Sequence, residues 1–487
     1  MEIFHHLIGI INPIATGLYV VSILVVVLFT ILENRNPVKT ISWVLVLILL
    51  PVIGFIFFIF FGQNLRKEKI IARKGLRNHE SLSRLAHAQI NQLTEGEKFP
   101  SAEIEEKRNL ISLLLNNSNA VVTIGNRIDI LNNGIPTFEA IFAELKKATQ
   151  FIHLEYYIFS DDNIGRKVKK LLKEKAAEGI EIRLIVDDVG SWELNKDFFE
   201  EMWASNIQVY SFLQVRFPAF TSKVNYRNHR KIIIIDGQIG FLGGINIADR
   251  YLHGSKKLGI WRDTHLRIEG DAVNTLQSIF LTDWFFVCQT ELSNPKYFPT
   301  KQPTGNKLVQ IVASGPDTDW PGIMLGIFQA VASAKKYVYI ATPYFMPTEG
   351  VLMALKTAAM GNIDVRILIP EKSDAFITHL SSHSFIREML DANVKFYFYQ
   401  KGFLHSKVMI IDDIVSMVGS ANMDFRSFEQ NFEVSAFVFD KETALELRKT
   451  FEEDLADSRL IVPEDWMNRS KKEKIKESFA RLVSPLL

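Results

Sequence analysis

Two stretches of the chain carry the same five residue types at the same spacing. In each stretch a histidine is followed by lysine two positions later, aspartate after seven, glycine after 14 and asparagine after 17. Two ungapped matches of this length, each around an apolar strand, are hard to obtain by chance. The two sets are His229, Lys231, Asp236, Gly243 and Asn246, and His405, Lys407, Asp412, Gly419 and Asn422.

The residue types predict phosphate-ester chemistry without a metal. In an extended strand, side chains two apart share a face, so each lysine points with its histidine. One neutral histidine can attack phosphorus, and a second, protonated one can give its proton to the leaving alcohol. Lys231, Asn246, Lys407 and Asn422 are expected to bind the phosphate and offset its charge. An ammonium beside each imidazole opposes a cation, and no second ligand has zinc spacing, so we expect neither metal nor cofactor.

The motif aspartates are expected to have a different role. Asp236 and Asp412 lie seven positions from their histidines, an odd number that places them off the histidine face. Although both belong to the repeated catalytic motif, we interpret them as structural residues that hold a turn. The pairs Gly243-Gly244 and Gly419-Ser420 are expected to let the backbone approach a bound anion closely.

Another carboxylate should then orient each imidazole. An alternating strand with an acid at its third position follows each motif, and the two acids are Asp263 and Glu433. We predict that both accept hydrogen bonds from the imidazoles, fix their tautomers and raise their basicity. The alternative is that they are ordinary solvated carboxylates.

The elements around the motifs repeat as well. Strands alternate with helices, which indicates α/β layers, and the strands are continuous apolar runs that suit a sheet covered on both faces. The histidines are 176 residues apart, so each half is domain-sized. We therefore expect two α/β domains related by a pseudo-two-fold axis, with the site in the cleft between them. The expected elements are helix 137–148, strand 151–159, helix 164–178 and strand 180–186, then helix 324–334, strand 337–341, helix 350–359 and strand 365–369.

The N-terminal region predicts a membrane anchor. Residues 41–61 carry no charge and, at about 1.5 Å per residue, would span the hydrocarbon core of about 30 Å. Residues 14–32 form a second uncharged run. Six basic residues between 66 and 77, opposed only by Glu68, place the rest of the chain in the cytoplasm and should attract anionic lipids. A buried core hairpin is the alternative.

Charge and cysteine content exclude other classes. The chain has 56 basic and 55 acidic residues, whereas nucleic-acid binding usually needs a markedly basic face. Cys288 is the only cysteine, so a disulfide framework is excluded. At the C-terminal end, apolar residues alternate with lysines over 471–487, which suits either a helix lying on a membrane or a packed terminal helix.

The paired motif resembles that of the phospholipase D superfamily, and the rest of the chain is similar to the two-motif bacterial cardiolipin synthases. The similarity includes the apolar N-terminal segment and three further stretches, at residues 152–159, 341–347 and 422–429. It implies a transmembrane hairpin at 1–65, a connector at 66–118 and two phospholipase D-like α/β/α sandwich domains at 119–300 and 301–487. It also implies a bacterial inner-membrane protein of several spans, with its domains in the cytoplasm.

The resemblance further implies phosphatidyl transfer between two phosphatidylglycerol molecules, giving cardiolipin and glycerol. His229 would be the nucleophile and His405 the general acid and base, although the symmetric pattern alone does not order them. A phospholipase D or a phosphatidyltransferase with another acceptor is the alternative. A nuclease is disfavoured by the charge balance, and an inactive lipid-binding scaffold by the completeness of both motifs. An acyl-chain entrance and ordinary packing in the core are equal alternatives for Phe217, Phe220, Tyr344, Phe345 and Met346.

Overall fold

The computed structural model describes residues 77–215 and 225–486, together with residues 37–49 and positions 17, 21, 24, 25, 27, 28 and 54. The chain divides into two compact units, residues 1–69 with 217–222, and residues 70–216 with 223–487. In the first unit, α2 (Pro37–Leu49) is an apolar helix of 13 residues. Within the described ranges, no helix has both the length and the apolarity needed to cross a membrane. The two uncharged runs expected to form a hairpin lie largely outside these ranges.

The second unit begins with helices that lead into a repeated α/β region. These are α5 (Arg77–Thr94), α6 (Ala102–Glu105) and α7 (Arg108–Ser118). The Ser101 side chain caps α6 by accepting from the backbone N–H of Ile104. Asn119, in the left-handed conformation with φ of 48°, ends α7.

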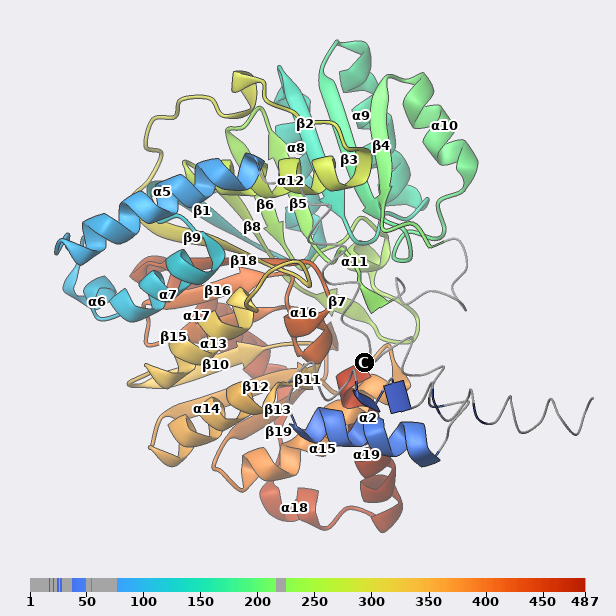
Figure 1. Cartoon of the computed structure of the whole chain (residues 1–487), viewed down its shortest axis with the longest axis vertical. Coiled ribbons are helices and arrows are strands. Elements are labelled where there is room, and N and C mark those ends of the chain that lie inside the picture. The colour runs from blue at the N-terminus through green and yellow to red at the C-terminus, as the bar shows by residue number, and fades with distance from the viewer. Residues whose placement is uncertain are drawn as a thin grey trace, which may run out of the picture. The chain divides into compact units, whose positions relative to one another are not determined.

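The first half of the repeat alternates strands and helices close to the predicted bounds (Figure 1). Its elements are β1 (Thr123–Asn132), α8 (Gly134–Lys147), β2 (Phe151–Tyr156), α9 (Asn163–Ala177), β3 (Glu181–Asp187), α10 (Lys196–Ala204), β4 (Ile207–Phe212), β5 (Lys231–Ile235), β6 (Ile239–Gly243), α11 (Arg250–His253), β7 (Ile260–Arg262), β8 (Thr264–Glu269) and α12 (Ala272–Cys288).

The second half repeats this order and adds a C-terminal extension. Its elements are η4 (Pro295–Tyr297), β9 (Lys307–Ser314), α13 (Gly322–Ala332), β10 (Tyr337–Ala341), β11 (Phe345–Met346), α14 (Glu349–Met360), β12 (Asp364–Pro370), α15 (Phe376–Leu390), β13 (Lys395–Tyr399), β14 (Gly402–Leu404), β15 (Val408–Ile411), β16 (Val415–Gly419), β17 (Met423–Asp424), α16 (Phe425–Glu429), β18 (Glu433–Phe439), α17 (Lys441–Ala456), β19 (Ser458–Leu460), α18 (Pro463–Met467), α19 (Lys471–Val483) and η5 (Ser484–Leu486).

One sheet runs through both halves. The strand order is β1-β8-β6-β5-β2-β3-β4 in the first half and β9-β18-β16-β15-β10-β12-β13 in the second, with β19 at the outer edge. Because β1 and β9 pair antiparallel at the centre, the two halves are related by a pseudo-two-fold axis. The two predicted α/β halves thus share one 15-stranded sheet, a connection that the sequence did not predict.

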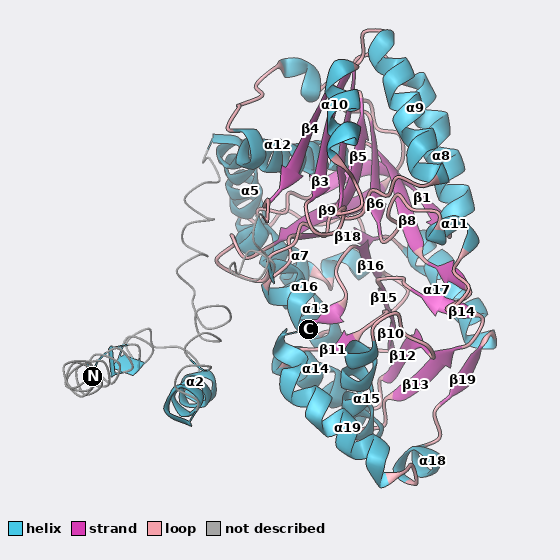
Figure 2. Ribbon diagram, turned by 90° about the vertical axis from the view of Figure 1, so that its right-hand side faces the viewer, coloured by secondary structure: helices cyan, strands magenta, loops and turns pink. Residues whose placement is uncertain are grey.

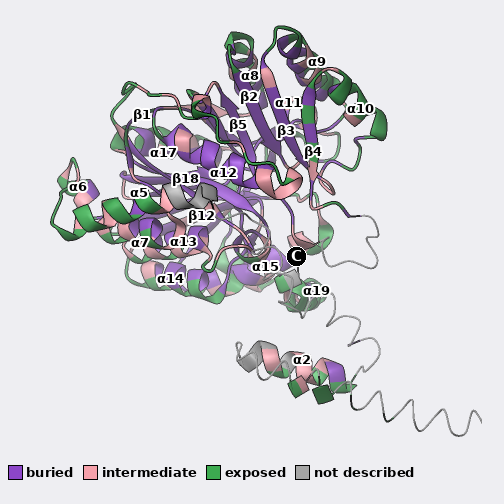
Figure 3. Cartoon of the chain, turned by 45° about the horizontal axis from the view of Figure 1, so that its top comes forward, coloured by how far each residue is buried: buried purple, intermediate pink, exposed green. Residues whose placement is uncertain are grey.

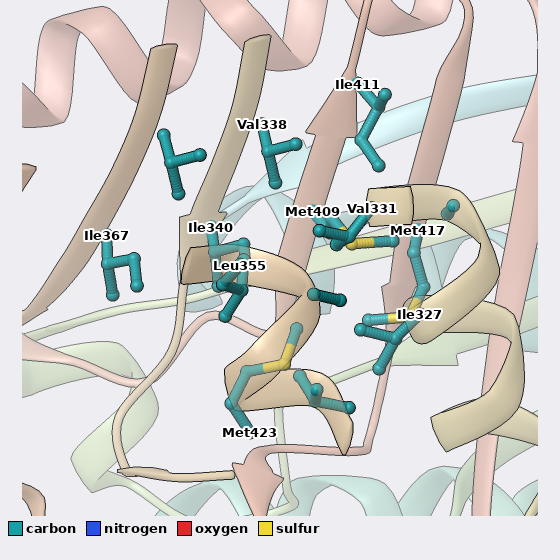
Figure 4. Close-up of a cluster of buried hydrophobic side chains, with 14 of the residues drawn as sticks. Ile327, Val331, Val338, Ile340, Leu355, Ile367, Met409, Ile411, Met417 and Met423 are labelled. Carbon is teal, nitrogen blue, oxygen red and sulfur yellow. The ribbon is translucent and has the colours of Figure 1, made fainter. Parts of the chain in front are cut away.

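Helices cover both faces of this sheet, which explains why its strands are uninterrupted apolar runs (Figure 2). In the second half, α13 and α14 pack on the face of β10, β12, β15 and β16. Figure 4 shows the branched aliphatic and methionine side chains that fill this contact, including Ile327, Leu355, Ile340 and Met409. Burial of such side chains is the main source of stability for the layers. Figure 3 shows the resulting buried centre of the sheet.

Candidate active site

The motif histidines stand where the two halves pair through their backbones. The segment before His405, β14, runs parallel to β7 of the first half and ends with Leu404 opposite Arg262. The backbone N–H of His405 then donates to the carbonyl of Arg262 at 2.7 Å. In the same way the N–H of His229 donates to the carbonyl of Phe432 at 2.9 Å. Each histidine is therefore placed beside the strand that carries the acid of the opposite half.

Each histidine consequently contacts the carboxylate of the opposite half. Nδ1 of His405 lies 2.7 Å from Oδ2 of Asp263, and Nδ1 of His229 lies 3.0 Å from both carboxylate oxygens of Glu433. Both acids are fully buried, so the alternative of solvated carboxylates is wrong. The sequence predicted these two acids but did not specify which histidine each would contact. The crossed arrangement makes the site depend on both halves.

The environment keeps the imidazoles neutral and fixes their tautomers. Burial lowers the pKa of His229 to about 4, although the charge of Glu433 opposes this. The pKa of His405 is lowered well below its usual value by burial and by the neighbouring Lys407 and Lys231. With each Nδ1–H donated to a carboxylate, Nε2 of each ring keeps the lone pair that can attack phosphorus or accept a proton.

The motif lysines lie beneath the histidines. Nζ of Lys231 donates to the carbonyl of His229 at 2.5 Å, and Nζ of Lys407 donates to the carbonyl of His405. Both are buried, and burial lowers the pKa of Lys231 to about 7 and that of Lys407 to about 8. An anion bound near the histidines would favour the charged forms of these two lysines.

The motif asparagines lie at the cavity wall. Nδ2 of Asn246 donates to the hydroxyl of Tyr251 at 2.5 Å, and Nδ2 of Asn422 donates to Oδ2 of Asp424 at 3.1 Å. Each amide group has two hydrogens, so one remains for a ligand after this contact is made. The position of both side chains is compatible with the predicted phosphate contact.

The glycines of the motif make room for neighbouring segments, and their predicted role in the approach of an anion stays a prediction. A Cβ on Gly243 would lie 2.4 Å from Nδ1 of His265, and a Cβ on Gly419 would lie 2.2 Å from Oγ of Ser435. At Gly244 a Cβ would lie 2.2 Å from Oδ1 of Asp263. Gly244 therefore permits the approach of the carboxylate that holds His405.

Asp236 and Asp412 lie at the far ends of β5 and β15 and hold turns, as parity predicted. Asp236 accepts from the backbone N–H groups of Thr149, Gln150 and Phe151 at 2.7–2.9 Å. Asp412 accepts from the N–H groups of residues 335–337 and pairs with Lys107 at 3.0 Å. Their grouping with the catalytic residues is therefore corrected: these carboxylates fix the strands on which the site is built.

Both histidines open into one cavity of about 510 Å³. Three arginines in its wall, Arg227, Arg250 and Arg426, were missed by the sequence reasoning. Arg250 and Arg426 each stand 21 positions after their histidine, so the internal repeat carried a signal that could have found them. Arginine binds phosphate oxygens through several N–H groups. The positive charge at the phosphate was expected from the lysines, whereas these arginines supply positive charge in the cavity wall.

The acyl-chain entrance stays a prediction for two of its five residues. Tyr344 and Met346 line the cavity. Phe345 between them is fully buried and packs on Phe385 and Phe396, so its prediction is wrong. Residues 217 and 220 lie outside the described ranges. Met346 is almost as buried as Phe345 and packs in the same core, although it also borders the cavity.

A duplicated α/β unit with two histidine–lysine motifs in one central cavity defines a phospholipase D-like protein. A family model described as "Cardiolipin synthase, PLD-like domain" matches residues 141–284 and 327–455, and one described as "Phospholipase_D-nuclease N-terminal" matches residues 17–63. The chain belongs to the cardiolipin synthase family of the phospholipase D superfamily.

Relatives of known identity match almost the whole chain. A cardiolipin synthase of Geobacillus sp. (strain WCH70) is 42% identical over 461 residues, covering 94% of this chain and 90% of the relative. One from Listeria monocytogenes serotype 4b is 38% identical over 482 residues, covering 98% and 100%. Among solved structures, phosphatidylserine synthase of Haemophilus influenzae Rd KW20 matches with a TM-score of 0.58 and 13% identity, over 80% of this chain and all of the other. That last likeness shows the shared fold.

Proposed function

We propose that this chain is a cardiolipin synthase that transfers a phosphatidyl group from one phosphatidylglycerol to another. The observation that carries the proposal is the pair of neutral histidines in one arginine-lined cavity, each held through Nδ1 by a buried carboxylate of the opposite half. A neutral histidine can act as the nucleophile, and the other, once protonated, as the acid; a double displacement at phosphorus requires both. The full-length similarity to cardiolipin synthases supports the same activity.

In the first step, Nε2 of His229 attacks the phosphorus of a phosphatidylglycerol. The P–N bond forms as the P–O bond to the head-group glycerol breaks, and His405 in its protonated form gives its proton to the leaving oxygen. Because burial and the lysines lower the pKa of His405, a bound phosphodiester anion is needed to favour the imidazolium. The arginines of the cavity wall and the motif lysines offset the negative charge that develops on the phosphoryl oxygens.

In the second step, a terminal hydroxyl of another phosphatidylglycerol gives its proton to His405. Its oxygen attacks the phosphorus, the P–N bond breaks and cardiolipin leaves, with His229 neutral again. Trapping the intermediate and sequencing the labelled peptide tests the order of the histidines. Label on His405 instead of His229 would reverse their roles.

We also propose that residues 1–65 anchor the enzyme in the bacterial inner membrane as a hairpin. Residues 66–118 would connect it to phospholipase D-like halves at 119–300 and 301–487, facing the cytoplasm. The two uncharged runs, the basic residues that follow them and the match of an N-terminal family model to residues 17–63 support this topology. Phosphatidylglycerol and other anionic membrane lipids are then the partners, without nucleic acid.

The deciding experiment incubates the purified enzyme with phosphatidylglycerol alone. Cardiolipin and glycerol in equal amounts are the expected products. Phosphatidic acid without cardiolipin would identify a hydrolase. A new lipid formed only after addition of serine, ethanolamine or another alcohol would identify a different acceptor.

A further inference from the structure

Among the residues that the structure describes, the C-terminal helix α19 packs one face on its neighbours and leaves the other face uncovered. Glu477 and Ala480 are buried on the inner side, where Glu477 pairs with Arg469 at 2.6 Å. Arg481, on the same side, binds α15 by donating a hydrogen bond to the carbonyl of Ser384 at 3.1 Å. The helix is thus held in place without using its outer side. Figures 1 and 2 show α15 and α19 lying side by side.

The outer side of α19 is apolar. Ile475, Phe479 and Leu482 recur at spacings of four and three residues, which places them in one stripe of the helix. Their exposed fractions of 56%, 67% and 76% are too high for residues of a packed terminal helix. An exposed stripe of this kind on a helix marks an interaction surface.

The start of α15 extends the stripe toward the catalytic cavity. Phe376 and Ile377 are 70% and 50% exposed. Their neighbours Asp374 and Thr378 line the cavity that holds the two histidines. Beyond the end of α19, η5 packs against α16, which carries the cavity residue Arg426. The apolar surface is therefore continuous with elements that form the cavity wall.

Lysines accompany the apolar side chains. Lys471, Lys472 and Lys476 of α19 are exposed beside the stripe. A bilayer rich in anionic phospholipid matches both features, since apolar side chains can enter the acyl boundary while lysines contact the headgroups. A second copy of the chain would place these lysines against one another, which like-charge repulsion disfavours.

We propose that the outer face of α19 together with the start of α15, here called the α15–α19 surface, docks the catalytic part of the chain on an anionic phospholipid bilayer. This inference rests on the proposed function, because a lipid must pass from the bilayer into the cavity for transfer to occur. The docking would place Asp374 and Thr378 at the membrane surface. It adds a contact of the catalytic halves themselves to any anchor supplied by the N-terminal region.

The test places a fluorophore on the surface of the full-length enzyme. Cys288→Ser removes the only native thiol, and Phe479→Cys then carries an environment-sensitive nitrobenzoxadiazole label. The enzyme is reconstituted in nanodiscs of phosphatidylglycerol and phosphatidylcholine, with nitroxide-labelled lipid as quencher. We expect a blue-shifted emission that the lipid quencher reduces, and weaker quenching in discs of phosphatidylcholine alone.

Lys170→Cys provides the matched control. The side chain of Lys170 is 80% exposed on α9, which lies far from α19 in Figures 1 and 2. A label there should stay unquenched in both kinds of disc. A label on position 479 that is not quenched in anionic discs overturns the proposal. A blue shift without quenching also overturns it, because it would mean that protein covers the surface.

A second variant links docking to turnover. The double substitution Phe479→Asp and Leu482→Asp should reduce transfer in vesicles about tenfold while detergent-dispersed phosphatidylglycerol is still converted at the normal rate. An equal loss in both assays would contradict a docking role. The quenching measurement needs no turnover, so repeating it with His229→Ala separates the two proposals. We expect His229→Ala to keep the quenching and to form no cardiolipin. Quenching by an enzyme with both histidines intact that forms no cardiolipin would remove the proposed function and leave the docking surface standing.

Discussion

Replacing Asp263 by asparagine tests how the cavity fixes the proton on His405. One oxygen of Asp263 accepts from the backbone N–H of Thr264 at 2.7 Å, and the other lies 2.7 Å from Nδ1 of His405. Only the carbonyl oxygen of an asparagine can keep the contact to Thr264. Its NH₂ group must then face Nδ1 and donate to it, which moves the imidazole proton to Nε2. The nitrogen that has to exchange protons with the lipid alcohol would carry the wrong tautomer.

Two magnitudes bound the expected loss. A hydrogen bond to a charged group contributes about 1.5–3 kcal/mol, or about 10–150-fold in rate. A wrong tautomer in a histidine–carboxylate pair can cost about 10⁴-fold. The tautomer change already includes the loss of the charged hydrogen bond, so the two figures bracket the expected fall in kcat of Asp263→Asn at about 10²-fold to 10⁴-fold.

Glu433→Gln is the matched comparison. Both oxygens of Glu433 lie 3.0 Å from Nδ1 of His229, and one also accepts from the hydroxyl of Ser420. A hydroxyl can accept as well as donate, so glutamine can turn its NH₂ toward Ser420 and keep its carbonyl on His229. Only the charge is lost, and we expect a fall of about tenfold.

The assay measures cardiolipin formed from phosphatidylglycerol by each purified variant, with thermal unfolding as the control for folding. The reasoning is refuted if Asp263→Asn keeps activity within about tenfold of the wild type, or if folded Glu433→Gln is the more damaged variant.

Three further outcomes are expected. Arg426→Ala or Arg250→Ala should raise KM for phosphatidylglycerol about tenfold or more, with partial recovery by lysine, because a charged contact to phosphate is lost; an unchanged KM would exclude phosphate binding. Gly244→Ala should abolish transfer in a folded protein, because its Cβ would lie 2.2 Å from a carboxylate oxygen of Asp263; normal turnover would contradict this packing. Stability should fall as pH falls below about 6.5, by about 1.4 kcal/mol per pH unit for each buried histidine, since burial lowers these pKa values and the unfolded chain binds more protons. Urea unfolding between pH 4.5 and 7 measures how the free energy of unfolding changes with pH. His265→Gln should make that change per pH unit smaller; an unchanged value would mean that His265 does not contribute to the pH dependence. Among the described residues the buried histidines are His153, His229, His265 and His405, with pKa lowered to about 3, about 4, about 4 and well below the usual value.

The local pattern of apolar residues was sufficient to predict most of the helices and strands around the site. The strand predicted at 337–341 is β10 with the same bounds, and the helix predicted at 164–178 is α9 within one residue at each end. Continuous apolar runs and helical periodicity specify such elements because the signal lies within a few neighbouring residues. The position of Asp236 at a turn followed from strand parity for the same reason.

Pairing across the repeat could not be predicted in this way. Strand β1 is contacted by both β8 and β9, and the second of these contacts fuses the halves into one sheet. Nothing in the sequence near Thr123 encodes a partner almost 190 residues away. The burial of Phe345 between two cavity residues was missed for a similar reason, because the two-residue strand β11 has too little pattern to reveal its face.

The sequence by itself determined the reacting groups, their duplication and their chemistry. It contained both histidines, both lysines and the two acids, since spacing within a strand decides which side chains point together. Only the tertiary structure decided that Asp263 holds His405 and Glu433 holds His229. Backbone pairing between the halves places each motif histidine beside the acid of the other half. The tertiary structure also placed three arginines in the cavity wall and the lysines beneath it, since which residues face a cavity depends on the packing of elements far apart in the chain.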